Sequence, residues 1–543
     1  MELENTKSKI ADILKRIILV IALFMFIMIL YGNLNYYVHI KNDYSEEVTS
    51  KLLTSKQYIE IGITIGIIFV ISLLEVKSEK IKKILLFVFL SISLIFQTML
   101  AIHSGSNIRT DQLSIYDSAL EIKNNNQLSA GNRYYLTMHK HQIPLVIIYS
   151  KIFKIFNGSE KIYWIYNIIF NLLSIFMISK IADILSKKHK INWLIIFLTM
   201  IFFIPLQILV TFFYGDIPAL TMTLIGTYYV LKYTEYNESE KRNSKYMIFA
   251  AIAMMFAIIF RKNSMIIVIA QFMYLLFNSL DNIAKKKKES EITSEKTILV
   301  SQREEDEFNE TLEKENKNYI FKLLSLIFIF IIIVYLPPKV LTNNMVKKYN
   351  LNERKPYPTV GYIYMGMMPS ERANGWYSGL AGEPGRKDPN GAVDYYKRGI
   401  EKRLKEFLHN PRMIKEFYIT KSVSMWSENT YGSIWNYLNL DNEKNIKNKE
   451  IIKYEEIISL TQKAILIFIS IRAIIIILSS LKNKYISNEI ILLILIALGG
   501  YTFHMLWEAK SRYIIPYLVL MFPLIGIYGI KDKEKYTNTN ICE

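Results

Sequence analysis

The stretch INWLIIFLTMIFFIPLQILVTFF at residues 191–213, with the YGDIP that follows at 214–218, decides the fold of this chain. Residues 191–213 carry no charge and exceed the roughly 20 apolar residues that cross the hydrocarbon core of a bilayer. A second apolar block, 217–233, begins directly after Tyr214-Gly215-Asp216. The pattern predicts two membrane spans joined by a tight turn.

The same alternation of apolar blocks and charged loops runs along the whole chain. Of the 543 residues, 51% are hydrophobic and 21% are charged, values that a soluble protein can also have. The distribution is different, because the charges gather between the apolar blocks, and it excludes a row of soluble domains, a collagen and a coiled coil. We therefore expect an all-α membrane protein with about twelve transmembrane helices, at 17–37, 58–74, 84–102, 163–185, 191–213, 217–233, 246–260, 264–280, 320–336, 463–481, 489–507 and 512–530.

The distribution of Lys and Arg predicts the orientation. The formal net charge is +18, and most basic residues lie in loops that this topology places in the cytoplasm. Both termini are then cytoplasmic, in a multi-pass protein of the cell membrane. The first apolar block has no cleavage site of small residues, so it is a retained span. No nucleic-acid-binding motif occurs, so we expect no nucleic acid partner, and the lone Cys542 excludes an internal disulfide and a cysteine metal cluster.

The spans divide the chain into four parts. Residues 1–83 hold two N-terminal transmembrane helices, and 84–336 form a core with an outer loop at 103–142 and a charged, flexible cytoplasmic linker at 281–319. Residues 143–156 are short and interrupted by lysines, which predicts an interfacial helix following that outer loop. Residues 337–460 form a mostly helical extracytoplasmic segment with helices at 393–408 and 413–426, and glycines divide its first half into loops. Residues 461–543 hold the last transmembrane helices and a cytoplasmic tail.

Two acidic positions stand out at the predicted outer face. Asp111, followed by Gln112 and then by Asp117, comes early in the outer loop, where a carboxylate can take a proton from a hydroxyl. The alternative is a helix-capping function next to Thr110. Asp216 lies in the outer turn between two spans, and its alternative function is likewise to cap the helix that follows.

Two basic motifs share that face. Arg261-Lys262 lies outside, against the charge bias of the topology, and Arg512-Tyr513 opens the last span after Glu508. Arginine binds phosphate oxygens with two parallel hydrogen bonds, so these cations are candidates for a phosphate site. The alternative is that they anchor the protein to lipid headgroups or extend toward the interface.

His141 and Gln142 belong to His139-Lys140-His141-Gln142, which has two histidines at alternate positions but no placed carboxylate. This pattern favours substrate contact or a structural function over a metal ligand, so a divalent metal has no support from the sequence and none is assigned.

Taken together, these features resemble the GT-C superfamily of polytopic membrane glycosyltransferases, and within it the protein O-mannosyltransferase and aminoarabinose-transferase type. The resemblance covers about residues 84–530 and rests on the topology and short motifs. It assigns Asp111 to the catalytic Asp of the first core loop, Asp216 to the second acidic position, and Arg512-Tyr513 to the late element near the lipid phosphate. The chain departs from the pattern where it has Asp111-Gln112 in place of an Asp-Glu pair, and in its two additional N-terminal spans.

The resemblance implies transfer of a sugar from a polyprenyl-phosphate donor, held in the membrane lipid, to a cell-envelope acceptor that is a glycan, a lipid or a protein. Asp111 would be the base in a single inverting displacement, and Arg261, Lys262 and Arg512 would stabilise the phosphate leaving group. Gln112, Asp117, His141, Gln142 and Glu508 would bind substrate, and no nucleotide or redox cofactor is expected. Two alternatives remain open: a transporter or flippase for lipid-linked saccharides, and a polysaccharide polymerase or ligase.

Overall fold

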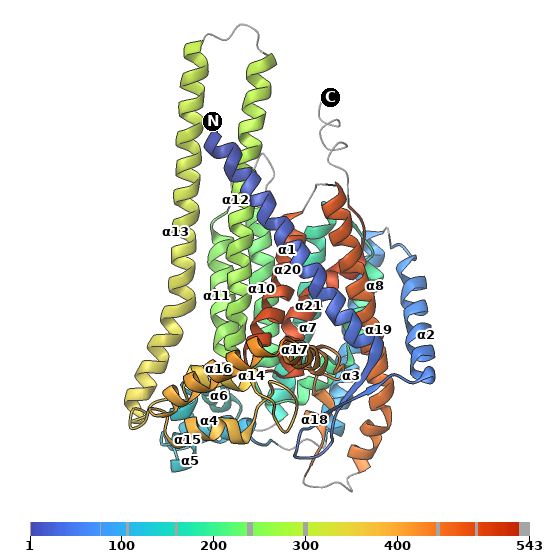
Figure 1. Ribbon diagram of the computed structural model, residues 1–543, viewed down its shortest axis with the longest axis vertical. Coiled ribbons are helices and arrows are strands. Elements are labelled where there is room, and N and C mark those ends of the chain that lie inside the picture. The colour runs from blue at the N-terminus through green and yellow to red at the C-terminus, as the bar shows by residue number, and fades with distance from the viewer. Residues whose placement is uncertain are drawn as a thin grey trace.

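The chain folds as an all-α multi-pass membrane protein (Figure 1). The computed structural model describes residues 2–76, 78–104, 108–157, 161–235, 243–296, 302–440, 446–483 and 487–530. Within these ranges, eight helices are long and apolar enough to cross a membrane, or nine if one bent pair counts as a span. The eight are α1 (Glu2–Asn35), α2 (Ser55–Ser72), α3 (Glu79–His103), α7 (Lys161–Ser186), α12 (Met265–Lys296), α13 (Gln302–Lys348), α19 (Ile446–Asn483) and α20 (Asn488–Leu506).

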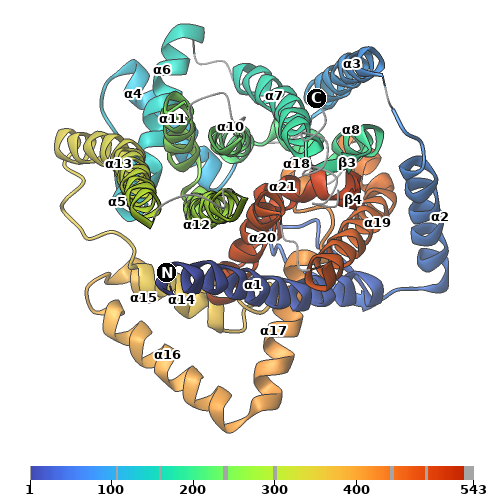
Figure 2. The ribbon, with the colours of Figure 1, turned by 90° about the horizontal axis from the view of Figure 1, so that it is seen from above.

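The other predicted spans are also helical: one is broken, two are shorter, and the fourth, α10 (Asp216–Thr234), has 19 residues but is not among the eight. The bent pair is α8 (Trp193–Phe202) followed by α9 (Ile204–Ile208) and a 3₁₀ turn, η2 (Leu209–Thr211), with a bend of 50°. The remaining three are α10, α11 (Lys245–Phe260) and α21 (Ile515–Gly526). Figure 2 shows α10, α11 and α21 standing among the longer helices of the bundle.

Polar side chains inside the bundle repair the broken helix. Backbone carbonyls that lose their helical partners in a membrane need another donor. Gln207 Nε2 donates to the Met200 carbonyl at 3.1 Å, and its own Oε1 accepts a 2.6 Å bond from Gln97. Asn167 Nδ2 donates to the carbonyls of Val210 and Phe212 at 3.0 and 3.1 Å. The Pro205 that follows the break explains why the helix bends there.

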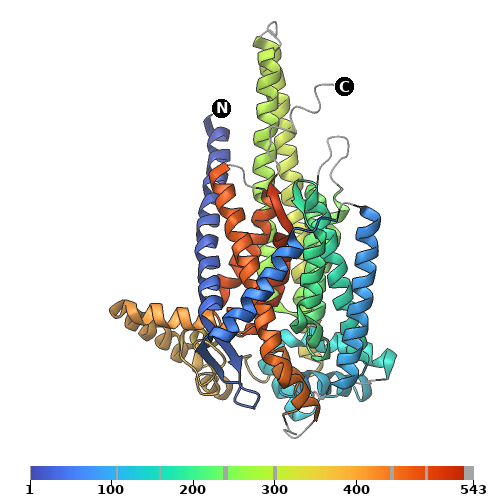
Figure 3. The same ribbon diagram turned by 90° about the vertical axis from the view of Figure 1, so that its right-hand side faces the viewer.

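Short helices gather at one end of the bundle, below the spans in Figure 1; we call this the site end. They come from the first core loop, as α4 (Asp111–Asn124), α5 (Ala130–Met138), η1 (Lys140–Gln142) and α6 (Ile143–Phe156), and from the late segment, as α14 (Thr359–Met367), α15 (Gly379–Lys387), α16 (Ala392–His409), α17 (Pro411–Trp426) and α18 (Ser433–Tyr437). The helix expected at 143–156 has the bounds of α6. The N-terminus of α1 lies at the opposite end in Figures 1 and 3.

Several expectations about the connecting segments are wrong. The segment 281–319 is helical where it is described, because α12 continues to Lys296 and α13 begins at Gln302. Five of the six glycines expected to form loops lie in helices, Gly361 and Gly366 in α14 and Gly379, Gly382 and Gly385 in α15, whereas Gly375 lies in a turn as expected, with a φ of +74°. The segment 337–460 is shorter than expected outside the long helices, since α13 runs to Lys348 and α19 starts at Ile446. Residues 297–301 and the tail 531–543, including Cys542, lie outside the described residues.

Two small antiparallel sheets tie distant segments together. At the site end, β1 (Tyr36–Ile40) pairs with β2 (Val48–Leu52), with Tyr36 opposite Leu52. At the other end, β3 (His189–Ile191) pairs with β4 (Ile527–Ile530). Ion pairs support that second end: Lys15 Nζ lies 2.7 Å from Asp281 Oδ1, and Lys188 pairs with Glu489.

Candidate functional site

A carboxylate between two arginines forms the centre of the site. Asp216 Oδ1 lies 3.6 Å from Arg261 Nε and 3.5 Å from Arg512 Nε, and all three side chains are largely buried. Asp216 is the first residue of α10, Arg261 precedes the 3₁₀ turn η3 (Lys262–Ser264) before α12, and Arg512 lies in η4 (Ser511–Ile514) before α21. The turns that join three pairs of helices therefore meet at one end of the bundle, so the three side chains share a face, as the sequence predicted.

Aromatic rings surround the two guanidinium groups. Tyr214 lies under both: its ring centre is 4.8 Å from Arg261 Cζ and 5.5 Å from Arg512 Cζ. Phe212 lies 4.2 Å from Arg512 Cζ, and Tyr513 lies 5.2 Å from Arg261 Cζ. These contacts hold the planar cations through their faces, and among the described residues Arg512 Nε has no hydrogen-bond partner.

Gly215 allows Asp216 to reach Arg261. A Cβ atom on Gly215 would lie 2.2 Å from the Phe260 carbonyl oxygen, so only a glycine fits at this approach. The φ angle of Gly215 is −83°, which any residue can adopt, so the requirement is steric. Because Arg261 directly follows Phe260, the close approach of the two backbones places Arg261 beside Asp216.

The first core loop holds the same turn from the other side. Gln112 Oε1 accepts a 3.0 Å bond from the Phe213 amide, and Gln142 Nε2 donates to the Tyr214 hydroxyl. Tyr149 Oη donates to the Tyr214 carbonyl at 3.0 Å. Gln112 and Gln142, expected to bind substrate, are buried and position the turn.

Asp111 opens α4 and is exposed. The N-cap position is the preceding Thr110, which has a φ of +50° and makes no side-chain cap, whereas Asp111 is the acidic residue of the first turn, where its charge favours the helix dipole. The negative charge of Asp111 interacts electrostatically with Tyr214, Arg261 and Glu508. The structure thus brings Asp111 into the surroundings of the central ion pairs.

Trp435 of α18 connects the loops that carry Asp111 and Arg512. Arg109, two residues before Asp111, stacks 4.3 Å from the indole centre and donates to the carbonyls of Trp435 and Leu438 at 2.6 and 2.7 Å. Lys510, two residues before Arg512, places its Nζ 5.3 Å from the same ring. Nothing in the sequence pattern pointed to Trp435.

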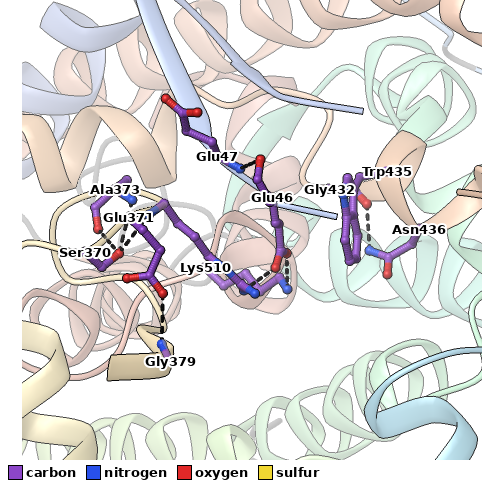
Figure 4. Close-up of polar contacts among 12 residues, drawn as sticks. Glu46, Glu47, Ser370, Glu371, Ala373, Gly379, Gly432, Trp435, Asn436 and Lys510 are labelled. Atoms are coloured by element: carbon purple, nitrogen blue, oxygen red, sulfur yellow. Dashed lines mark hydrogen bonds and ion pairs between the residues drawn. The ribbon is translucent and has the colours of Figure 1, made fainter. Parts of the chain in front are cut away.

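Glu46, in the loop between β1 and β2, is a further residue that the sequence analysis missed. It is 2% exposed and forms ion pairs with both Lys510 and Arg372 (Figure 4). Burial alone would raise the pKa of Glu46, but the Lys510 and Arg372 charges outweigh burial and lower it. The N-terminal part of the chain therefore contributes directly to the loop that carries Arg512.

Glu508 lies in that loop and is buried. Its amide donates to the Tyr362 carbonyl at 3.0 Å. Burial raises the pKa of Glu508 to about 7; the Lys510 charge opposes this shift and the Asp111 charge adds to it. A carboxyl group with such a pKa can exchange a proton near neutral pH.

Two buried side chains brace the loop further. Lys421 Nζ donates to the carbonyls of Met505 and Trp507 at 2.9 and 2.8 Å, just before Glu508. Burial lowers the pKa of Lys421 to about 7, and the Glu508 charge partly offsets this. Glu428 accepts a 2.6 Å bond from Ser511 Oγ, next to Arg512.

Three of the predicted residues lie at the edge of the site or outside it. Lys262 and His141 are exposed, and the charges of Lys262 and Arg261 reach the His141 ring. Asp117 faces Glu121 along α4, and burial and then the Glu121 charge raise its pKa. Among the described residues, no group of three or more His, Cys, Asp or Glu side chains could hold a metal ion.

A small hollow of about 10 Å³, enough for one water molecule, opens beside the central ion pairs. Asp216, Arg261, Asn263, Arg512, Tyr513 and Tyr517 are among the residues that line it. Within the described structure, the buried Asp216 Oδ2 has no hydrogen-bond partner. The arrangement can bind an oxyanion through two arginines with an exposed carboxylate nearby. Comparison with known proteins gives no match to a family model, a curated protein or a solved structure.

Proposed function

We propose that this protein is a GT-C-type membrane glycosyltransferase that moves a sugar from a polyprenyl-phosphate donor to a cell-envelope acceptor. The observation that carries the proposal is the pair of arginines, Arg261 and Arg512, which share Asp216 at the end of the spans where a lipid-borne phosphate can reach them. The donor's tail would remain in hydrocarbon while its phosphate meets the guanidinium groups.

The expected chemistry assigns a step to each group. The bond from the sugar C1 to the phosphate oxygen breaks, and the electron pair leaves with the polyprenyl phosphate, whose charge Arg261 and Arg512 stabilise. Asp111 takes the proton of the acceptor hydroxyl as its oxygen bonds to C1 from the opposite face. One displacement of this kind inverts the anomeric centre. The exposed position of Asp111 supports this assignment, because an acceptor must arrive from the aqueous side.

The proposed topology has about twelve spans, formed by α1, α2, α3, α7, the α8–α9 pair, α10, α11, α12, α13, α19, α20 and α21, with both termini in the cytoplasm. It is supported by the N-terminus of α1 lying opposite the site end in Figure 1. The site end then faces the extracytoplasmic side of the cell membrane.

A transporter or flippase for lipid-linked saccharides is the second candidate, and the broken α8–α9 span favours it, since discontinuous helices form many transport sites. The polar residues at the break argue against it. Gln207 donates to the Met200 carbonyl beside the break and Asn167 to carbonyls at the end of the bent segment, so both satisfy backbone groups rather than line a path. A polysaccharide polymerase or ligase shares the donor chemistry and would differ in its acceptor.

The test is sugar transfer by the full chain, purified in detergent, from synthetic polyprenyl-phosphate hexoses and pentoses to an envelope extract, with release of polyprenyl phosphate measured in parallel. Asp111→Asn should abolish transfer, because the acceptor then lacks its base. Asp117→Asn, on the same helix but facing Glu121, is the matched control and should keep activity. Full transfer by the Asp111 variant would remove this residue from the mechanism, and transport of labelled donor across vesicles without transfer would establish the second candidate.

A further inference from the structure

The helical hairpin formed by α16 and α17 projects sideways from the bundle. Figure 2 shows α16 outside the ring of spans, and Figure 3 shows the hairpin at the level where the spans end at the site end. A membrane that surrounds the spans continues outward past this level, so a segment projecting there meets the lipid headgroups.

The hairpin is held in this position by its own contacts. Arg403 Nε donates to the Met367 carbonyl at 3.0 Å, and its guanidinium stacks on Phe407 and Phe417 at 4.4 and 5.2 Å. These contacts join α14, α16 and α17, and α17 also packs against α1. The projecting geometry therefore does not depend on a partner.

The exposed half of α16 has the composition of an interfacial helix. Leu404 and Leu408 lie one turn apart and are 47% and 78% exposed. Arg398, Lys402 and Lys405, at spacings of four and three, form a basic stripe beside them. Such a helix inserts its apolar edge at the acyl boundary while the long basic side chains extend to the headgroups.

The charge of the hairpin selects the kind of lipid. Residues 392–416 contain seven Lys or Arg and four Asp or Glu. Lys405, Arg403 and Arg412 pair with acids of the hairpin itself. Arg398 and Lys402 are exposed and make no ion pair among the described residues, so their charge is available to an anionic surface.

We propose that the α16–α17 hairpin lies on the membrane leaflet at the site end and binds the anionic headgroups of its phospholipids. Arg403 joins the hairpin to α14 through the Met367 carbonyl, and the Tyr362 carbonyl of α14 accepts a hydrogen bond from the Glu508 amide. Contact between the hairpin and lipid therefore holds the site at a fixed depth relative to the headgroups. The inference concerns the surface of the protein and does not depend on the enzymatic activity proposed above.

A nitroxide at position 408 tests the proposal. The Leu408→Cys variant, made in a Cys542→Ser background and labelled, is placed as the full chain in nanodiscs of phosphatidylcholine alone or mixed with phosphatidylglycerol. We expect collisions with lipid-soluble oxygen to exceed those with a water-soluble nickel complex. Lys387→Cys on α15, whose native side chain is 76% exposed, is the matched control and should give the opposite order. Equal access of the nickel complex at 408 and 387 would overturn the proposal.

The charge dependence is tested by the double variant Arg398→Glu/Lys402→Glu carrying the same label. In the parent chain, phosphatidylglycerol should move the label at 408 deeper into the membrane. One basic residue contributes about fivefold to the affinity for an anionic surface, so reversing both charges should lower the affinity of the hairpin for phosphatidylglycerol membranes by at least about tenfold. An unchanged response, or shielding of 408 only after an acidic protein or polymer is added, would refute an anionic lipid surface as the partner.

Discussion

Replacing Gly215 with Ala tests how the central ion pairs are assembled. The new Cβ would lie 2.2 Å from the Phe260 carbonyl oxygen, whereas real Cβ contacts essentially never fall under 3.0 Å, so the two backbones must separate by at least 0.8 Å, the difference between these values. Overpacking of this size costs about 1–3 kcal/mol. A displacement near 1 Å at catalytic groups lowers the rate by roughly 100-fold.

The assay is thermal unfolding of the purified protein in detergent, together with the proposed sugar transfer. Gly215→Ala should unfold at a lower temperature and transfer sugar far more slowly, because Asp216 moves away from Arg261. Gly131→Ala in α5 is the control, since a Cβ there meets nothing within 4 Å. The obstacle in Gly215→Ala is a backbone carbonyl, so no side-chain rearrangement can relieve it. A Gly215→Ala protein as stable and active as the Gly131→Ala protein would refute the close approach of the turn to Phe260.

Further predictions follow from the buried charges, all measured as unfolding stability in detergent. Asp216→Asn should lower the free energy of unfolding by about 3 kcal/mol, because both guanidinium groups lose their counter-charge. An unchanged free energy of unfolding would mean that water screens these ion pairs and that they do not stabilise the fold. Glu46→Gln should cost a similar amount, about 3 kcal/mol, whereas Glu47→Gln, at a half-exposed pair, should cost under about 1 kcal/mol. Glu508 has its pKa raised from 4.5 to about 7, so the folded state holds a proton that the unfolded chain releases, and stability should fall as pH rises through this window. Glu508→Gln should remove that decline; a persisting decline would assign it to another group.

The apolar helices could be predicted because their signal is local. Each predicted span is helical over most of its length, although 191–213 is broken, and the bounds of α6 agree with the expected 143–156. The extensions of α12 and α13 were missed because a charged helix in water has no apolar face to give it a period. Gly361 and Gly366 suggested loops, yet both lie in α14 and each packs closely against a residue outside that helix. A Cβ on Gly361 would clash with the Tyr357 ring, and one on Gly366 would clash with the Trp507 carbonyl. The sequence alone does not distinguish a glycine that allows close packing of a helix from a glycine that forms a turn.

The candidate site was predictable in part for the same reason. Asp216, Arg261 and Arg512 sit at span ends on one side, so the topology alone brings them to a common face. The partners that hold them do not follow from topology. Glu46 is more than four hundred positions from Lys510 in the numbering, and only the folded β1–β2 loop places it there. Gln112 was expected to bind substrate because it follows Asp111. Its actual partner is the Phe213 amide, on another loop, and the sequence does not show that these two loops lie together.

The indole of Trp435 receives one cation from each of two loops, Arg109 from the first and Lys510 from the last. In evolution, this shared ring couples the two positions: a lineage that loses the indole loses the support of both loops in a single step. Substitutions at 109 and 510 should consequently be inherited together with a change at 435, and homologues that keep all three should also keep the spacing of two residues to Asp111 and to Arg512.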